Sequence, residues 1–250
     1  MQEIKVDENK LKILKVNDSS DKLGVKHTLF NLPIRGLLIA KSGNGKNTVL
    51  SNILMNEEYG YTKIFKGDSI YIFTPNHIED DPKMKLLVKF YSIPDNNIYS
   101  GESDPDLDAL KHVYEGLIDE FRNNKKQKPL IIIDDYSSSG KFMPKYSILT
   151  KIFSNSRKFQ INIFFLSQYY FSVPPSVRNN ANVLIVGNTS NKNLKSICDE
   201  HNMLKNDRLF RDIFRQYTRN QFDFFTINYT NNDIEKLYLD KDFKPIKIDQ

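Results

Sequence analysis

A glycine-rich turn with one lysine stands near the start of the chain. Residues 37–50 read LLIAKSGNGKNTVL, in which an apolar run is followed by Gly43, Gly45 and Lys46. Such a turn lets backbone N–H groups converge on phosphate oxygens, and the lysine supplies a positive charge for the β- and γ-phosphates. The residues expected to form this cradle are Ser42, Gly43, Asn44, Gly45, Lys46, Asn47 and Thr48.

Two residues depart from the usual pattern of such loops. Ala40 stands where the first glycine is expected, and a small side chain is tolerated there at modest conformational cost. Asn47 stands where a Ser or Thr hydroxyl usually holds Mg²⁺, and an amide oxygen is a weaker, longer-reaching substitute. Thr48 follows directly, but one residue along a helix turns a side chain by about 100°. We expect ATP binding to be retained and the affinity for Mg²⁺ to be either reduced or restored by other groups. The alternative interpretation of this segment is a simple strand-to-helix turn that binds no phosphate.

A pair of carboxylates follows a second apolar run. The segment PLIIIDD, residues 129–135, ends in Asp134 and Asp135. A strand of this kind can place its terminal acid beside the phosphate loop, so we expect Asp134 to hold Mg²⁺ and Asp135 to orient or deprotonate the attacking water. A third run, INIFFLSQ, ends in Gln168. Because ligands gather at the carboxyl ends of parallel strands, Gln168 is expected to face the γ-phosphate.

The elements that would position these groups are visible as apolar runs. Nearly continuous β-branched or aromatic segments, typical of strands covered on both faces, predict five strands. They span residues 35–40, 69–75, 129–135, 161–168 and 182–188. Apolar residues at three- and four-residue steps predict amphipathic helices over 104–124 and 147–159, and the residues after Lys46 can form a further helix.

Strands that alternate with helices indicate βαβ units. The predicted fold class is therefore α/β, a P-loop NTPase of the RecA/ASCE type with a mainly parallel central sheet covered by helices on both faces. Residues 1–30 are expected to be an N-terminal arm or edge strand, 31–190 the ATPase core, and 191–250 a C-terminal elaboration of the same domain. That elaboration should contain two helices, near 191–203 and 206–217, and an antiparallel strand over 221–229.

Composition narrows the class of protein without choosing a function. The 250 residues are 39% apolar and 27% charged, with a net charge of +5, as in a globular protein that tolerates a polyanionic partner. The single cysteine, Cys198, excludes an internal disulfide and favours a reducing, intracellular compartment. No apolar run approaches the length of a membrane span, so no membrane partner is expected.

Together these segments resemble the viral DNA-packaging ATPases of the FtsK–HerA superfamily, found in poxviruses, other large DNA viruses and virophages. The matching pieces are GLLIAKSGNGKNT, IIIDDYSSS, SNSRKFQINIFFLSQ and VPPSVRNNANVLIVGN. The resemblance implies ATP on Lys46, Mg²⁺ and water activation on Asp134 and Asp135, and a sensor role for Gln168. Ring ATPases of this kind use an arginine from the neighbouring subunit, for which Arg157 is the first candidate and Arg178 the second.

The resemblance implies a motor that packages viral double-stranded DNA into a preformed capsid. Its partners would be DNA gripped without regard to sequence, further copies of itself in a homo-oligomeric ring, and a capsid vertex or portal protein. The site of action would be the host cytoplasm or viral factory, with association to the virion as a variant. The alternatives are a DNA-pumping or helicase-type ATPase in replication or conjugation, and a non-hydrolysing nucleotide-binding structural subunit, which Asn47 favours.

Overall fold

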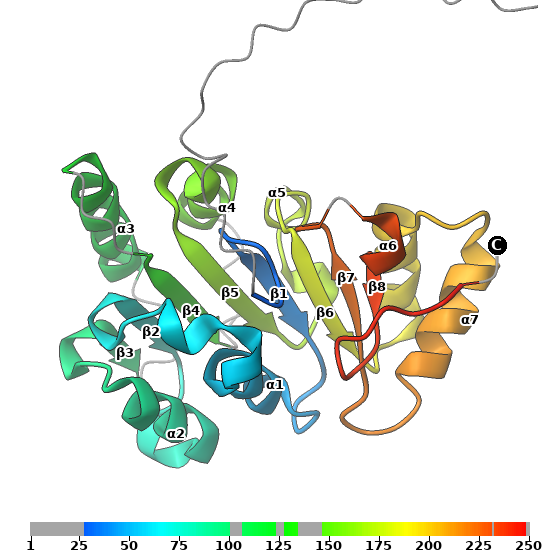
Figure 1. Ribbon diagram of the computed structural model, residues 1–250, viewed down its shortest axis with the longest axis horizontal. Coiled ribbons are helices and arrows are strands. Elements are labelled where there is room, and N and C mark those ends of the chain that lie inside the picture. The colour runs from blue at the N-terminus through cyan, green and yellow to red at the C-terminus, as the bar shows by residue number, and fades with distance from the viewer. Residues whose placement is uncertain (1–27, 101–106, 124–127, 135–146, 232, 249–250) are drawn as a thin grey trace, which may run out of the picture.

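The apolar runs form the strands of one central sheet. The structure, a computed structural model, describes residues 28–100, 107–123, 128–134, 147–231 and 233–248 (Figure 1). Within this part of the chain the sheet has eight strands in the order β3-β2-β4-β5-β1-β6-β7-β8. The strands are β1 Arg35–Ile39, β2 Ile70–Thr74, β3 Ile98–Ser100, β4 Leu130–Asp134, β5 Asn162–Ser167, β6 Val183–Gly187, β7 Phe224–Asn228 and β8 Tyr238–Leu239.

Most neighbouring strands run parallel, and their register brings three strand ends level. From β3 through β2, β4, β5 and β1 to β6, each strand pairs in parallel with the next. Strand β7 pairs antiparallel with β6, and β8 pairs antiparallel with β7. Strand β5 lies between β1 and β4, with Leu166 opposite Leu38 on one side and Asp134 on the other. The carboxyl ends of β1, β5 and β4 therefore meet at one edge of the sheet.

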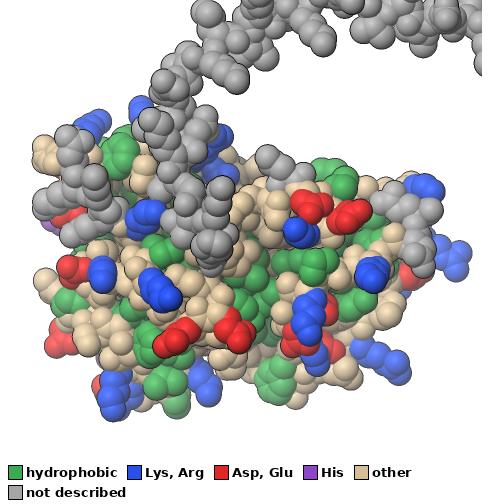
Figure 2. Space-filling view, in the orientation of Figure 1, with side chains coloured by type: hydrophobic (Ala, Val, Ile, Leu, Met, Phe, Trp, Pro, Cys, Tyr) green, Lys and Arg blue, Asp and Glu red, His purple; other side chains and the backbone are tan. Residues whose placement is uncertain are grey.

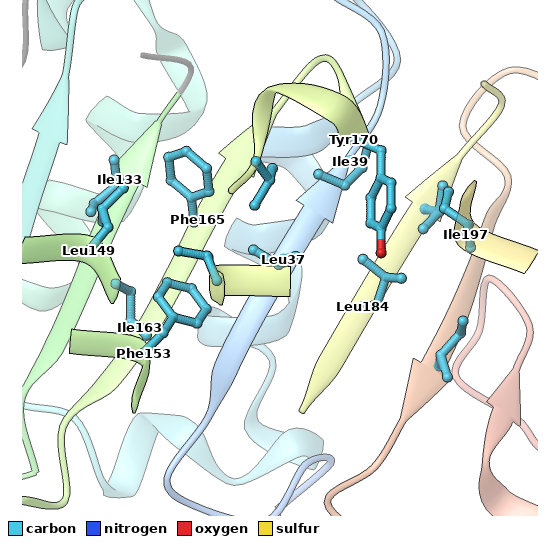
Figure 3. Close-up of a cluster of buried hydrophobic side chains, with 14 of the residues drawn as sticks. Leu37, Ile39, Ile133, Leu149, Phe153, Ile163, Phe165, Tyr170, Leu184 and Ile197 are labelled. Atoms are coloured by element: carbon cyan, nitrogen blue, oxygen red, sulfur yellow. The ribbon is translucent and has the colours of Figure 1, made fainter. Parts of the chain in front are cut away.

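Helices cover both faces of the sheet. They are α1 Lys46–Met55, α2 Pro82–Tyr91, α3 Leu107–Arg122, α4 Ser147–Phe159, α5 Pro175–Arg178, α6 Asn191–His201 and α7 Asp207–Tyr217. Side chains alternate between the faces because successive residues of a strand point to opposite sides. Leu38 packs in the cluster covered by α1 and α2, whereas Leu37 and Ile39 pack in the cluster covered by α3, α4, α6 and α7. Figure 3 shows the second cluster, with Leu37, Ile39 and Phe165 on the same side of the sheet.

The predicted fold class is confirmed, and so are most of the predicted elements. The five predicted strands are β1, β2, β4, β5 and β6, and the antiparallel strand predicted over 221–229 is β7, which pairs with β6. The predicted helices correspond to α1, α3, α4, α6 and α7 within the described residues. The sequence pattern did not predict the helices α2 and α5 or the strands β3 and β8. The short alternating run in residues 1–30 lies outside the described residues.

Gly36 on β1 gives a test of how tightly the sheet is packed. A Cβ built on Gly36 would stand 2.4 Å from Cδ1 of Phe164, a side chain with 0% exposure. We expect Gly36→Ala to lower the free energy of unfolding by roughly 1–3 kcal/mol, because the buried ring cannot move away. Gly116 on α3 is the matched control: its Cβ would meet nothing within 4 Å, so Gly116→Ala should stabilise by up to ~1 kcal/mol. Urea unfolding of both variants checks this, and equal effects would contradict the described packing.

Candidate nucleotide-binding site

The glycine-rich turn joins β1 to α1 with the geometry of a phosphate loop. Gly43 and Gly45 have positive φ values of 75° and 82°, which side chains disfavour. Gly45 occupies the N-cap of α1, where no side chain caps the helix and the first turn contains no acidic residue. The N–H groups of this helix end, with their partial positive charge, are thus left for an external anion.

A pocket of about 330 Å³ opens on this loop. Its lining consists of Ser42, Gly43, Gly45, Lys46, Asn47, Thr48, Asn76, Asp134 and Phe222. Six of the seven predicted cradle residues line the pocket, and the seventh, Asn44, donates its backbone N–H to the Lys41 carbonyl inside the loop at 3.2 Å. A larger pocket of about 590 Å³ lies near the carboxyl terminus, but it is lined mainly by apolar side chains such as Met203, Ile234 and Ile246.

Lys46 reaches back along its own loop. Its side chain is mostly buried, with 8% exposure, and its ammonium donates a hydrogen bond to the carbonyl of Ala40 at 3.1 Å. The ammonium is therefore held at the start of the loop, between β1 and α1. This position fits a lysine that contacts terminal phosphate oxygens.

Asn47 connects the loop helix to two carboxylates. Its Nδ2 donates to Oδ2 of Asp134 at 3.0 Å and to Oδ2 of Asp81 at 2.6 Å. Its Oδ1 is buried and accepts no hydrogen bond within the described residues. The sequence pattern predicted that Asn47 and Asp134 share one site, and the structure brings them into direct contact.

Asp134 and Gln168 lie at the ends of neighbouring strands. Asp134 closes β4 with 2% exposure, and the register places it level with Leu166 of β5. Gln168 follows β5, whose last carbonyl, that of Ser167, accepts a hydrogen bond from the Ala40 N–H at 3.2 Å. Gln168 thus starts at the same edge as the loop, although its side chain is not part of the pocket lining. Asp135 lies outside the described residues.

Three residues that the sequence pattern did not indicate also face this site. Asn76 and Phe222 line the pocket, and Asp81 contacts Asn47. Asn76 and Asp81 follow β2, a strand end at the same edge, so the rule that ligands gather at carboxyl ends of strands could have found them. No local signal marks Phe222, which comes from the loop before the antiparallel strand β7.

The loop before β7 touches the glycine-rich loop directly. Phe222 has a positive φ of 69° and remains 58% exposed, and a Cβ on Gly45 would stand 3.0 Å from its ring. Gln221 donates from Nε2 to the Gly43 carbonyl at 3.5 Å. Figure 1 shows the two loops at the same edge of the sheet. The C-terminal elements therefore supply one wall of the pocket.

The two candidate arginines occupy different environments. Arg157 is an exposed residue of the last turn of α4. Burial and the positive charge of Arg157 lower the pKa of Arg35, the first residue of β1, so Arg157 lies near the amino edge of the sheet, opposite the glycine-rich loop. Arg157 does not line the nucleotide pocket of its own chain.

Arg178 is held inside its own chain. Its side chain is 9% exposed, its Nη1 lies 3.1 Å from Oε1 of Glu200, and its guanidinium stacks over the Tyr170 ring at 4.7 Å. The Tyr170 hydroxyl also contacts Oε2 of Glu200 at 2.6 Å and Nε2 of His201 at 2.7 Å, and His201 Nδ1 lies 3.0 Å from the Tyr229 hydroxyl. These contacts favour a structural role for Arg178.

The fold and site define the chain as a P-loop NTPase in which one strand, β5, separates the phosphate-loop strand from the strand that carries the acidic residue. The chain belongs to the Poxvirus A32 protein family, whose model matches residues 24–230. This match confirms the resemblance read from the motifs. No curated protein matches the chain at a significant level.

Solved structures share the fold at low sequence identity. B204, the DNA-packaging ATPase from Sulfolobus turreted icosahedral virus, is 14% identical, with a TM-score of 0.54 over 79% of this chain and 94% of that chain. B204 from Sulfolobus turreted icosahedral virus 2 in complex with AMP is 14% identical, with a TM-score of 0.57 over 85% and 97%. The cytoplasmic domain of the type VII secretion ATPase EccC from Thermomonospora curvata is 9% identical, with a TM-score of 0.52 over 78% and 24%. These similarities establish the fold.

Two features are absent from the described residues. None of the helices there is both long and apolar enough to cross a bilayer. Groups of three or more His, Cys, Asp or Glu suited to a metal ion are likewise absent from the described ranges.

The buried cluster around Arg178 predicts a pH dependence of stability. Burial, together with the charge of Arg178, lowers the pKa of His201 from 6.5 to about 4. Between these values the unfolded chain binds a proton at this residue and the folded chain does not, so stability falls as the pH decreases. We expect a loss of about 3 kcal/mol between pH 7 and pH 4 from this residue.

Urea unfolding of the parent and of His201→Gln across this range measures the effect. The parent should show the steeper pH dependence, and the exposed His112 provides the control substitution, His112→Gln. Parallel curves for the parent and His201→Gln would show that His201 is protonated equally in both states.

Proposed function

We propose that this chain is an ATP-driven motor that moves double-stranded DNA into a preformed viral capsid. The observation that carries the proposal is the meeting of Lys46, Asn47 and Asp134 in one pocket at the carboxyl edge of the sheet, in a member of the Poxvirus A32 protein family. B204 of Sulfolobus turreted icosahedral virus 2, which shares the fold, is described as a genome packaging NTPase and has been solved with AMP and with ATP-gammaS.

The residues in the pocket suit a magnesium nucleotide. Asn47 Oδ1 is a buried oxygen that accepts no hydrogen bond from the described residues, and Nδ2 of the same amide contacts Oδ2 of Asp134 at 3.0 Å. The amide and carboxylate oxygens of these two side chains are the kind of ligand that Mg²⁺ prefers. Asn47 and Asp134 would hold the ion, which when bound neutralises charge on the β- and γ-phosphates.

Each of the remaining groups would have a separate role in ATP binding or hydrolysis. The N–H groups of the loop and of the start of α1 bind phosphate oxygens, and Lys46 places a charge beside the terminal phosphates. Asp135 takes a proton from the attacking water, and Gln168 senses the γ-phosphate from the end of β5. Arg157 of a neighbouring subunit stabilises the charge that develops on the transferred phosphoryl group. This last role requires a homo-oligomeric ring.

DNA would be held through its phosphates. The net charge of +5 favours a polyanion, and contacts to the backbone carry no sequence information. Figure 2 shows Lys and Arg side chains scattered among acidic ones over the visible face, without one continuous basic patch. A capsid vertex or portal protein would complete the assembly, in the host cytoplasm or viral factory.

Phosphate release with and without duplex DNA tests the activity. We expect hydrolysis that duplex DNA stimulates, with a stimulation that falls steeply as salt increases because phosphate contacts release counterions. Lys46→Ala should lose ATP binding, whereas Asp135→Asn should retain binding and lose hydrolysis by at least ~10²-fold. Lys195→Ala, at an exposed position on α6, is the control. Binding without any turnover in the parent would favour the non-hydrolysing structural subunit instead.

Mixing experiments test Arg157. Arg157→Ala subunits keep a complete pocket but cannot supply the arginine, and Lys46→Ala subunits supply it but cannot bind ATP. Each variant alone should be inactive, and a mixture should recover part of the parental turnover, because some complete pockets then adjoin an intact Arg157. Arg208→Ala, at a side chain with 93% exposure, should behave as the parent does. If the mixture stays inactive, the trans role of Arg157 is wrong.

A further inference from the structure

We propose that Asp81 is a positioning residue of the nucleotide site, which orients the Asn47 amide so that its oxygen, and not its nitrogen, is available to Mg²⁺. The inference rests on the proposed function, since it concerns the metal that accompanies ATP. It explains how a chain with an amide in place of the usual hydroxyl can still bind that metal.

The hydrogen bonds of Asn47 carry the argument. An amide NH₂ has two donors, and here Nδ2 lies 2.6 Å from Oδ2 of Asp81 and 3.0 Å from Oδ2 of Asp134. Ionised carboxylates only accept hydrogen bonds, so the nitrogen must face them. Both donors are then occupied, whereas Oδ1, the acceptor of the side chain, receives no hydrogen bond from the described residues.

Asp81 is itself fixed by the start of α2. It is the N-cap of that helix, with Oδ1 accepting from the N–H groups of Lys83 at 2.9 Å and Met84 at 3.1 Å. Pro82 at the first helical position presets the helical φ. Helix α2 also meets α1, where Ser51 Oγ donates to the Lys83 carbonyl at 3.5 Å. One carboxylate oxygen thus holds Asp81 to the backbone, and the other is directed at Asn47.

A second carboxylate is needed because an amide has two different ends. A hydroxyl presents an oxygen in every rotamer, whereas an amide turned by 180° presents NH₂, which cannot bind a cation. Asp134 is expected to turn toward Mg²⁺ when the ion is bound, and its hold on Nδ2 is then weakened. Asp81 continues to accept from Nδ2 and keeps the oxygen in place, as residues behind the direct ligands do in other metal sites.

Asp81→Ser separates this role from helix capping. Serine also caps helices well, so α2 should be retained while the contact with Asn47 is lost. Asp81→Asn is a second variant, in which an amide NH₂ that cannot accept replaces one carboxylate oxygen. Asp233→Ser is the matched control, because Asp233 caps the 3-10 helix Ile234–Lys236 through the Glu235 N–H at 3.1 Å and does not line the nucleotide pocket.

The readout is metal binding and not turnover. The affinity for Mn²⁺ is measured by electron paramagnetic resonance in the presence of saturating ADP, and the affinity for ADP is measured without metal. We expect Asp81→Ser to weaken Mn²⁺ binding by about 10- to 100-fold and to leave metal-free ADP binding unchanged. In an Asn47→Thr background, the same Asp81→Ser change should alter Mn²⁺ affinity by less than about threefold, since a hydroxyl needs no orientation.

The outcomes are distinct. Unchanged Mn²⁺ affinity in Asp81→Ser and Asp81→Asn, or an equal loss in the parental and Asn47→Thr backgrounds, overturns the inference and leaves the proposed function intact. A parent chain that binds neither ADP nor Mn²⁺–ADP overturns the proposed function, and with it the role of Asp81. A loss confined to the parental background, with Asp233→Ser unaffected, supports the inference.

Discussion

The site depends on one constraint, which is that the strands β1, β5 and β4 end at the same edge of the sheet. Lys46 and Asp134 are far apart in the sequence, and a whole strand separates β1 from β4. They line one pocket because parallel pairing aligns Leu38, Leu166 and Asp134 in a single row. Side chains alternate between the two faces along a strand. A slip of one residue in the β1–β5 or the β4–β5 pairing would therefore turn the buried side chains of the shifted strand to the wrong face. The packing on both faces thus fixes the register, and the register fixes the site.

The parts of this structure that were predictable are those encoded locally. Strands buried on both faces are continuous apolar runs, and a glycine-rich turn followed by lysine is recognisable without any knowledge of the fold. Helix α2 was missed because PKMKLLVKFY buries only Met84 and Leu87 and leaves Leu86 and Phe90 exposed, so its apolar pattern is ambiguous. Strands β3 and β8 are short, and their pairing depends on neighbours supplied by the rest of the sheet.

The remaining features depend on tertiary contacts. Nothing in the spacing of the sequence indicates that Asp81 reaches Asn47, because that contact results from the packing of α2 beside α1. The burial of a side chain is equally hard to predict from the sequence. Arg178 and Arg157 both lie in plausible motifs, but Arg178 is buried beside Glu200, whereas Arg157 is exposed on α4. Asn47, which departs from the usual loop pattern, belongs to a hydrogen-bonded group whose other members are Asp134 at the end of β4 and Asp81 at the start of α2.

The contact between the loop before β7 and the glycine-rich loop has a consequence for dividing the chain. Phe222 forms part of the pocket, and Asp223 beside it lies 3.3 Å from Lys241 near β8. A fragment that stops after β6 would keep the phosphate loop and Asp134 but would leave Gly43 and Gly45 uncovered on that side and the edge of β6 unpaired. The smallest piece able to enclose a nucleotide therefore extends through the antiparallel strands, and domain boundaries drawn from the motifs alone would cut through the pocket wall.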